Sequence, residues 1–311
     1  MKKSAIVRIV IWSVVALVLT GILISALVLK ENPNAPIISG EYKNYKYDNE
    51  KEYSVGATEL SAMEFTSVIV DWISGNIYLH AYDGDKVKIE ETSHNDIEEK
   101  YELRWLVKDN TLYIKPCKSM NSWDLANKIP TKDLFVYIPD DLAVRMDKVY
   151  IDNASACVNI SGITAEEFDI TSVSGDIWYE KCGAKEIKIE NVSGYVNITE
   201  TNTDIFDVES VSGNVEIMGI VNSLNIDSVS GKVLLCTNKP PQSADVSTVS
   251  GDIEFQLPEN DGFCIDFDSV SGKVTSELSL IINNGEQTYG DGSRDFDFET
   301  ISGNVYIEIK K

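Results

Sequence analysis

The sequence has few of the residues and motifs from which enzyme and metal sites are commonly built. Its only histidines are His80 and His94, and they do not have the spacing of metal ligands. There is no Gly-x-Ser-x-Gly nucleophile elbow, and the segment Gly290-Asp291-Gly292 lacks the lysine of a phosphate-binding loop. Carboxylates are so abundant that no catalytic pair stands out. These absences predict a protein that is not an enzyme and has no catalytic residues.

Cysteine is scarce and irregularly placed. The five cysteines form no Cys-x-x-Cys pair, and an odd number leaves at least one of them without a disulfide partner. A disulfide framework or a structural metal is therefore not expected, and buried free thiols are expected instead. The cysteines are Cys117, Cys157, Cys182, Cys236 and Cys264.

Basic residues are also few, with 27 Lys and Arg against 50 Asp and Glu and a formal net charge of −23. Such a surface repels nucleic acid and anionic lipid headgroups, so we expect no nucleic-acid partner. The simplest interpretation of this charge is that it keeps the protein soluble.

One long apolar run lies near the N-terminus. Residues 9–29 contain no charged side chain, and at ~1.5 Å per residue they would span the ~30 Å core of a membrane as a helix. Lys2, Lys3 and Arg8 precede the run, which predicts a cytoplasmic tail over 1–8 and an extracytoplasmic C-terminal domain. A cleaved signal peptide is the alternative. Its apolar core would be only ~7–15 residues, and the sites after Ala26 and Ala35 are poor, so we favour a single-pass anchor in the cell membrane.

Three further regions follow the predicted anchor. Residues 30–60 mix proline, asparagine, tyrosine and charge without an apolar period, which predicts a stalk. Residues 61–150 have the alternating apolar pattern of an N-terminal β region. Residues 151–311 contain a Ser-Gly repeat.

The repeat is the most informative feature of the chain. Successive serines are 18 to 21 residues apart, except for the last pair, which are 31 apart. A period near 20 residues is typical of a repeat architecture in which each unit packs on its neighbours. The copies are Val173-Ser174-Gly175, Val192-Ser193-Gly194, Val211-Ser212-Gly213, Val229-Ser230-Gly231, Val249-Ser250-Gly251, Val270-Ser271-Gly272 and Ile301-Ser302-Gly303.

Aligned on their serines, the copies show apolar residues at every second position. Positions six and four before the serine, and three and five after it, are apolar in nearly every copy, which predicts a strand, a Ser-Gly corner and a second strand. Short polar residues two before the serine can hydrogen-bond the turning backbone. Weaker copies around Ser74 and Ser155 extend the series upstream. The fold class is therefore all-β.

Two arrangements of these strands fit the pattern. In a parallel β-solenoid, or β-helix, each unit of ~19 residues is one coil that rises by the ~4.8 Å spacing of strands. In an antiparallel β-meander, Ser-Gly would be a two-residue hairpin loop. Tight hairpins prefer Asn-Gly, Asp-Gly or a leading glycine. We therefore favour the solenoid.

Acidic residues occupy two outward positions of the repeat, five and three before the serine. In stacked coils they form files of carboxylates, and neighbours about 5 Å apart repel by on the order of 1 kcal/mol in water. A basic partner or weakly bound Ca²⁺ would relieve this repulsion, and a merely solvated face is the alternative. No other cofactor is expected. The candidate cation-binding face comprises Asp207, Glu209, Asp227, Asp266, Asp268, Asp297 and Glu299.

Several segments resemble the bacterial DUF4097 family, also labelled adhesin or Toastrack. These are the repeated Val-Ser-Gly phrase, Asn110-Thr111-Leu112-Tyr113-Ile114, the strand Leu134 to Pro139, and the closing segment from Tyr289 to Val305. The resemblance covers about residues 61–311. It implies an extracytoplasmic β-repeat domain, often tethered to the membrane in Gram-positive bacteria, with relatives associated with envelope-stress sensing. It implies no catalytic residues.

Together these observations predict a membrane-anchored extracytoplasmic domain that acts by binding, in sensing or scaffolding at the cell envelope. An envelope protein or a polysaccharide is the expected partner. An adhesin that contacts surfaces or polysaccharide is the first alternative. A polysaccharide-active β-helix enzyme is the second.

Overall fold

The structure is a computed structural model of the chain. It describes residues 44–310 except for 63, 122–123, 125–127 and 284–285. The predicted cytoplasmic tail, the predicted membrane helix over 9–29 and the first part of the predicted stalk lie outside the described residues. Within the described part, no helix is both long and apolar enough to cross a membrane. The described residues are mostly β-strand, as the repeat predicts.

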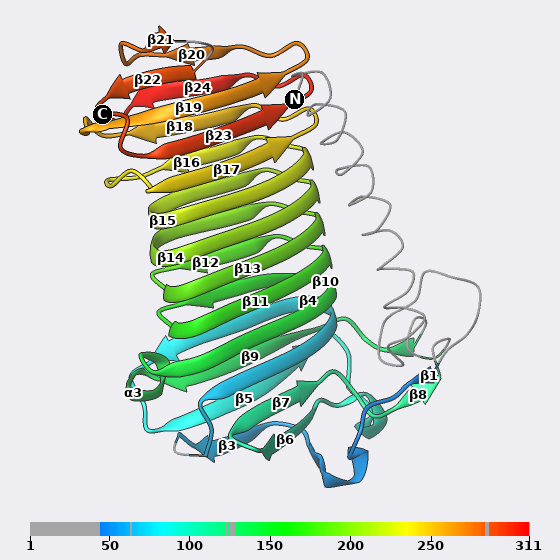
Figure 1. Cartoon of the computed structure of the whole chain (residues 1–311). Helices are drawn as coiled ribbons and strands as arrows, with labels where there is room; N and C mark the ends of the chain where they lie inside the picture. The colour runs from blue at the N-terminus through cyan, green and yellow to red at the C-terminus, as the bar shows by residue number, and fades with distance from the viewer. Residues whose placement is uncertain (1–43, 63, 122–123, 125–127, 284–285, 311) are drawn as a thin grey trace. The chain divides into compact units, whose positions relative to one another are not determined.

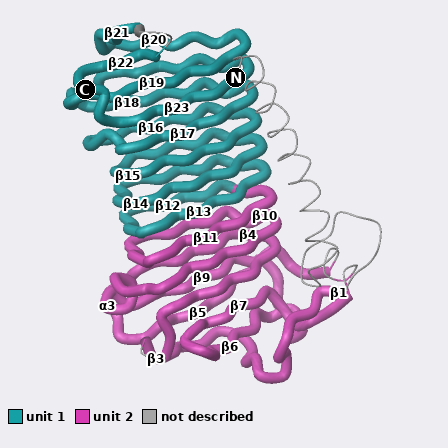
Figure 2. Tube along the Cα trace, viewed as in Figure 1, with its two compact units in different colours: residues 1–16, 176–311 teal, residues 17–175 magenta. Residues whose placement is uncertain are grey.

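The chain divides into two compact units, which are described separately (Figure 2). One unit comprises residues 17–175. The other comprises residues 1–16 and 176–311.

In the unit of residues 17–175, long strands pair in parallel. Strand β4 (Ser67–Tyr82) pairs with β10 (Met146–Ser161), and β10 pairs with β11 (Thr164–Ser174). The register places Ser155 opposite Ser74, so the two weaker copies of the repeat stack on each other as the alignment predicts. On its other edge, β4 pairs in parallel with β7 (Thr111–Lys115) along its first half and with β9 (Lys132–Pro139) along its second half.

Antiparallel strands close the other side of these coils. Strand β5 pairs with β9 and β3, and β6 pairs with β7 and β2. The remaining elements of the unit are short (Figure 1). The bounds are β1 Asn44–Tyr45, β2 Ser54–Val55, β3 Thr58–Ser61, β5 Lys86–Ser93, β6 Arg104–Lys108, β8 Met120–Asn121, α3 Asp140–Ala143, and the 3₁₀ turns η1 Glu50–Glu52 and η2 Glu99–Tyr101.

In the unit that contains residues 176–311, each strand on either side of a Ser-Gly corner pairs in parallel with the equivalent strand of another copy. For example, Val208 lies opposite Ile226, its equivalent in the next copy. The corners are therefore not antiparallel hairpin loops. The strands are β12 Ile177–Glu180, β13 Gly183–Ser193, β14 Val196–Ser212, β15 Val215–Ser230, β16 Val233–Cys236, β17 Ser243–Thr248 and β18 Ile253–Leu257.

The last copies do not stack in the order of the chain. Strand β23 (Asp295–Thr300) lies between β17 and β19 (Gly262–Ser269), and β24 (Val305–Ile309) lies between β18 and β20 (Val274–Ser276). The outermost coil, which contains β19 and β20, therefore comes earlier in the chain than the coil of β23 and β24 on which it stacks (Figure 1). The 31-residue spacing of the last two serines accommodates the return path, which contains the antiparallel pair β21 (Ile281–Asn283) and β22 (Glu286–Gly290).

The alternating apolar positions form the core. Side chains six and four before the serine, and three and five after it, are buried in almost every copy, as predicted. The exceptions belong to the outermost coil of residues 262–276, where Phe267, Val274 and Ser276 are only half-buried.

The Ser-Gly corner has a structural role. The Ser212 hydroxyl donates to the Val192 carbonyl of the neighbouring coil at 3.4 Å, and equivalent serines make the same bond. Gly213 has φ of 140°, and a Cβ there would lie 1.9 Å from the Gly194 carbonyl oxygen. The glycine is thus needed for close coil stacking as well as for its backbone conformation.

Candidate functional site

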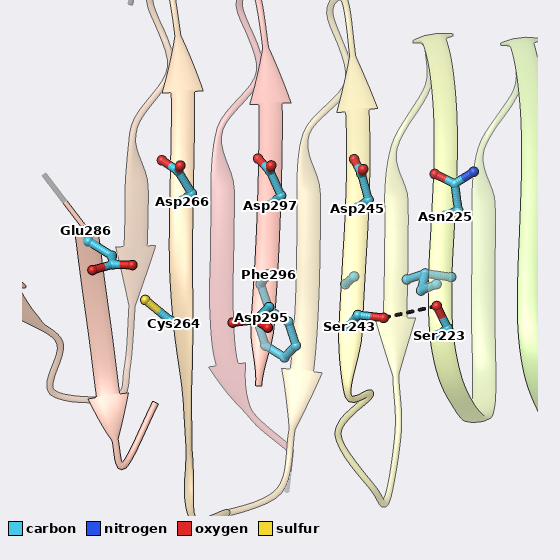
Figure 3. A pocket seen from close by; sticks show the side chains of 12 residues that line it. Ser223, Asn225, Ser243, Asp245, Cys264, Asp266, Glu286, Asp295, Phe296 and Asp297 are labelled. Carbon is cyan, nitrogen blue, oxygen red and sulfur yellow. Dashed lines mark hydrogen bonds between the residues drawn. The ribbon is translucent and has the colours of Figure 1, made fainter. Parts of the chain in front are cut away.

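Carboxylates line one outer face of the unit that contains residues 176–311. Asp245 on β17 lies opposite Asp297 on β23, and Asp297 lies opposite Asp266 on β19. The three side chains stand at one level on adjacent strands, with Asn225 of β15 beside them (Figure 3). Parallel strands are ~4.8 Å apart, so the carboxylates are held close together by the backbone. We call this row and the next the acidic face.

A second row runs beside the first. It contains Glu209 on β14, Asp227 on β15, Ser247 on β17, Glu299 on β23 and Asp268 on β19, each opposite the next. The side chains of both rows are half-buried or exposed, as the outward positions of the repeat predict.

All seven residues predicted from the sequence lie on this face, but their neighbours differ from those expected of coils stacked in chain order. Inserting β23 places Asp297 between Asp245 and Asp266, and Glu299 beside Asp268. Asp207 lies farther along the row, where its Oδ1 accepts a hydrogen bond from Asn225 Nδ2 at 2.9 Å. The sequence-based set omits Asp245, although its position five before a serine could have identified it.

Burial and mutual repulsion raise the pKa values of these carboxyl groups. The pKa of Asp297 is raised to about 6 by burial and by the charges of Asp245, Asp266 and Asp268. The pKa of Glu299 is raised to about 7, again by burial first and then by neighbouring carboxylates. Burial also raises the pKa values of Glu209, Asp227 and Asp245. The carboxyl groups with the largest rises in pKa, Asp297 and Glu299, are therefore both on the inserted strand β23.

A basic side chain lies beside one end of the acidic face, next to Glu209. Lys188 Nζ lies 2.6 Å from Glu190 Oε1 on β13. Among the ion pairs of the described residues, none includes Asp245, Asp266 or Asp297. This part of the face is open to an external positive charge.

A depression of about 410 Å³ lies over the unneutralised part. Asp245, Asp266 and Asp297 line it, and Glu286 of β22 stands at one side (Figure 3). Hydroxyl groups lie along it as well, since Ser223 Oγ and Ser243 Oγ are 3.0 Å apart. Carboxylates and hydroxyls together suit a ligand that carries positive charge and hydrogen-bond donors.

Metal binding at this face stays a prediction. Across the described residues, no group of three or more His, Cys, Asp and Glu side chains is arranged to hold a metal ion. Weakly bound Ca²⁺ would therefore have to be shared between pairs of carboxylates on adjacent strands.

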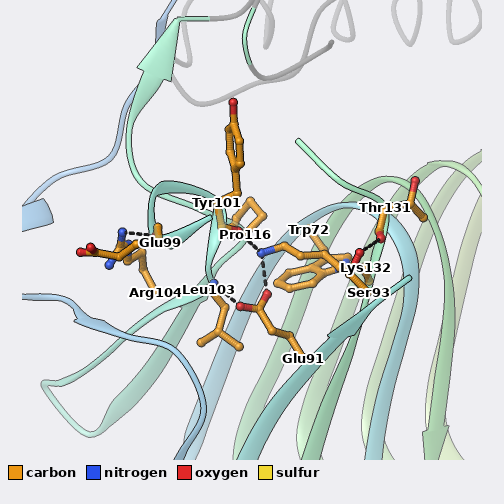
Figure 4. A network of polar contacts seen from close by, with 10 residues as sticks. All are labelled: Trp72, Glu91, Ser93, Glu99, Tyr101, Leu103, Arg104, Pro116, Thr131 and Lys132. Atoms are coloured by element: carbon orange, nitrogen blue, oxygen red, sulfur yellow. Dashed lines mark hydrogen bonds and ion pairs between the residues drawn. The ribbon is translucent and has the colours of Figure 1, made fainter. Parts of the chain in front are cut away.

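A second polar cluster lies in the unit of residues 17–175. The buried Lys132 amino group contacts Glu91 Oε2 at 2.5 Å and donates to the Tyr101 and Pro116 carbonyls (Figure 4). Glu91 Oε1 accepts the Leu103 amide at 2.7 Å. Burial lowers the pKa of Lys132. Because the donors and acceptors are matched inside the protein, this cluster holds the antiparallel strands on the coils and is closed to a ligand.

The two histidines and the five cysteines do not form a shared site among the described residues. His80 Nδ1 lies 2.5 Å from Ser161 Oγ on the outer face of β4 and β10, and burial lowers its pKa. His94 is exposed after β5, and the two histidines share no site. All five cysteines are free thiols, as predicted, but only Cys117 and Cys182 are buried, and Cys157, Cys236 and Cys264 are half-buried because they do not occupy the apolar core positions of the repeat.

These features define an acidic β-repeat domain whose copies pair in parallel. Residues 65–308 match the family described as Toastrack DUF4097, so the chain belongs to this family. The resemblance to this family over about residues 61–311 is confirmed by this match. No curated protein matches the sequence significantly.

Three solved structures are similar to the chain. An adhesin candidate from Bacteroides fragilis NCTC 9343 aligns with a TM-score of 0.51 at 13% identity, over 82% of this chain and 97% of that one. An adhesin candidate from Parabacteroides distasonis ATCC 8503 aligns at 0.35 and 12% identity, over 82% and 97%. A candidate cell adhesion protein from Clostridium sporogenes ATCC 15579 aligns at 0.28 and 12% identity, over 83% and 100%. The first supports the fold alone.

Proposed function

We propose that this chain is a membrane-anchored, extracytoplasmic β-solenoid domain that acts by binding, in sensing or scaffolding at the cell envelope. The acidic face around Asp245, Asp297 and Asp266 is the observation that supports this proposal best. The partner that fits this face is an envelope protein with an exposed lysine- or arginine-rich segment.

The acidic face favours binding because its charges are fixed before a ligand arrives. Backbone pairing between β17, β23 and β19 sets the spacing of the carboxylates. Burial first, and then the charges of Asp245, Asp266 and Asp268, raise the pKa of Asp297, so the carboxylates already repel one another in the folded domain. A positively charged segment would relieve that repulsion without reorganising the sheet, which favours both affinity and fast association.

Catalysis has less support than binding. The depression holds carboxylates and hydroxyls but no histidine or basic side chain. A polysaccharide-active enzyme needs an acid and a base or nucleophile held apart in different environments. Here the carboxylates stand side by side on adjacent strands of one face.

A binding experiment with matched variants tests the role of the acidic face. The full-length chain in detergent is titrated with a ten-residue lysine peptide, and binding is measured by calorimetry at two salt concentrations. We expect the triple variant Asp245→Asn, Asp297→Asn and Glu299→Gln to bind at least about tenfold more weakly, a loss of about 1.4 kcal/mol. The control variant Asp204→Asn with Glu259→Gln removes two exposed carboxylates elsewhere. Equal binding by both variants would contradict the proposal.

The location is tested in intact cells that produce the chain. A membrane-impermeant amine reagent should label exposed lysines such as Lys181 and Lys239 without lysis, and the protein should sediment with membranes. Labelling that requires lysis, or release of the protein into the soluble fraction, would contradict an external, anchored domain.

An adhesin that contacts polysaccharide is the second candidate function. One observation favours it, a row of half-buried aromatic side chains on the outer face of β4 and β9. The rings of Tyr78 and Phe135 stack with centroids 4.8 Å apart, and Tyr137 continues the row. Aromatic rings can pack against the apolar faces of sugars. Glycan-array binding that is lost in Tyr78→Ala and kept in the acidic-face triple variant would favour this candidate.

A further inference from the structure

Residues 44–53, which belong to the predicted stalk, are folded onto the unit of residues 17–175. Strand β1 pairs antiparallel with β8, and the two strands form a sheet apart from the large one (Figure 1). The next strands along the chain, β2 and β3, belong to the large sheet through β6 and β5. Within the described part of the chain, only the β1–β8 pair joins the backbone of residues 44–53 to the rest of the unit. We call residues 44–53 the strap.

A small hydrophobic cluster holds the strap in place. Tyr45, Tyr47 and Cys117 are 6%, 8% and 0% exposed and pack together. The ring centroid of Tyr47 lies 5.6 Å from that of Tyr45 and 4.9 Å from that of Tyr53. The Tyr47 hydroxyl also donates to the Cys117 carbonyl at 3.1 Å. Tyrosine rings therefore supply most of the contact between the strap and the unit.

This contact also contains buried polar atoms that weaken it. The Tyr45 hydroxyl and the Ser119 hydroxyl are buried and have no hydrogen-bond partner among the described residues. Each loses its hydration without gaining a bond in return, which costs free energy. An isolated two-stranded sheet is itself only marginally stable. Few buried contacts and little backbone pairing are the features of segments that open locally while the remaining structure stays folded.

The loop beneath the strap has attachments of its own. The Pro116 carbonyl accepts a hydrogen bond from the Lys132 amino group (Figure 4), and the Lys118 amide donates to the Lys100 carbonyl at 3.2 Å. Neither bond involves the strap. The strap can therefore leave without unravelling the antiparallel strands, and its departure uncovers Cys117.

We propose that residues 44–53 are a releasable strap, which lifts off the unit of residues 17–175 while the β-strands of that unit stay folded. The chain reaches the strap before any other described element, so a displacement of the preceding, membrane-side residues acts on the strap first. The joint between that side and the domain then has a closed state, with Cys117 covered, and an open state, with Cys117 accessible. This inference goes beyond the proposed binding function, because the acidic face lies in the other unit.

Thiol labelling of the full-length chain in detergent measures the opening. N-ethylmaleimide is applied for increasing times, and mass spectrometry of the peptides gives the labelling rate of each cysteine. Burial raises the pKa of the Cys117 thiol to about 12, so the closed strap protects it. Hydrogen exchange of the β4 amides in the same sample reports unfolding of the unit. We expect Cys117 to become accessible at least about tenfold more often than β4 opens, with little dependence on urea.

Two conservative variants should change the labelling of Cys117 in opposite directions. Tyr47→Phe removes the donor to the Cys117 carbonyl and should speed labelling about threefold, whereas Tyr45→Phe removes a hydroxyl without a partner and should slow it about threefold. The control Tyr137→Phe, on β9 of the same unit, should label at the wild-type rate. The melting temperature of each variant is measured to show that it is folded.

Two results would overturn the strap. One is labelling of Cys117 that follows the opening of β4 in rate and in urea dependence, because the thiol is then uncovered only when the unit unfolds. The other is an unchanged labelling rate in both Tyr45→Phe and Tyr47→Phe, because another movement then uncovers the thiol. The acidic-face triple variant should label like the wild type, so failure of the strap leaves the proposed binding function standing.

Discussion

The two units end their stacks of coils in different ways. In the unit of residues 17–175, antiparallel strands cover the outer strands β7 and β9, and the buried Lys132–Glu91 pair joins them to the coils. In the unit that contains residues 176–311, the outermost coil carries half-buried core positions, exposed isoleucines and unneutralised carboxylates. A repeat stack needs a polar cap at its ends to stay soluble. In the first unit the antiparallel strands and the buried pair form such a cap, whereas in the second unit the antiparallel strand β22 pairs with only one described coil strand, β19, and leaves the carboxylates uncompensated.

The same contrast appears in how each end treats charge. Glu91 is 6% exposed at its side chain and is paired with Lys132, so its charge is compensated inside the protein. Asp297 and Glu299 have raised pKa values because burial and the neighbouring carboxylates both disfavour their charged forms. The capped end should therefore depend on one buried contact, and the open end on pH and on ligands.

The largest effect is expected at the capped end. Lys132→Met leaves Glu91 buried without its counter-charge, which should lower the free energy of unfolding by about 3–5 kcal/mol. Urea unfolding followed by circular dichroism measures this loss. The double variant Lys132→Met with Glu91→Met should recover part of it. Lys86→Met removes an exposed pair with Glu59 and should change the free energy of unfolding very little. Equal losses for Lys86→Met and Lys132→Met would refute the role of the buried pair.

A matched pair of corner glycines measures how far the outermost coil can yield. A Cβ at Gly251 or at Gly272 would lie 1.9 Å from the carbonyl oxygen of the neighbouring corner glycine, and neither residue has a positive φ. Gly251 is itself approached by the next corner, Gly303, whereas the coil of Gly272 is outermost. We expect Gly251→Ala to cost about 2–3 kcal/mol and Gly272→Ala about 1 kcal/mol, because the terminal coil can shift. Thermal unfolding of both variants checks this, and a larger loss at Gly272 would show that the terminal coil is not the looser one.

The stability of the open end should fall as pH rises. Asp297 and Glu299 have ordinary pKa values of 3.8 and 4.5, raised in the folded state to about 6 and about 7. The folded state therefore binds more protons than the unfolded state between about pH 4 and pH 7. The stability that these groups contribute is fully present below about pH 4 and is lost as pH rises through 6 and 7. Allowing for solvent screening, the change is on the order of 1 kcal/mol.

The measurement for this prediction is the melting temperature between pH 8 and pH 5. The variant Asp297→Asn with Glu299→Gln should show a flatter profile than the wild type. The control Asp204→Asn should keep the wild-type slope. A wild-type melting temperature that does not rise on mild acidification would show that repulsion in the acidic face is already screened.

The local rules of the repeat made much of this fold predictable. Alternating apolar positions such as Ile226 and Val246 identify the buried face, and the outward positions identify Asp227 and Glu299. The coil order was not predictable in the same way, because every copy carries the same pattern and can stack on any other. The 31-residue gap before Ser302 signals an insertion but does not say between which coils.

The candidate site shows the same limit. Its residues come from the repeat pattern, but its neighbours come from the insertion of β23, which the pattern does not encode. The exposed Ile281 and Ile282 were hidden in the sequence because a short apolar run reads equally well as core. The buried Lys132 was hidden for the opposite reason, since lysine is rarely found inside a protein.

Calcium provides the most delicate test of the difference between the two ends. If Ca²⁺ bridges carboxylates of the acidic face, it should stabilise the unit that contains residues 176–311 by about 1 kcal/mol at five times its dissociation constant. The effect should raise the melting temperature at constant ionic strength, be absent with sodium alone, and disappear in Asp297→Asn with Glu299→Gln. Lys132→Met should leave the calcium shift unchanged, because its cluster is closed to ions. A shift no larger than that in the sodium control would show that Ca²⁺ does not bridge the carboxylates of the acidic face.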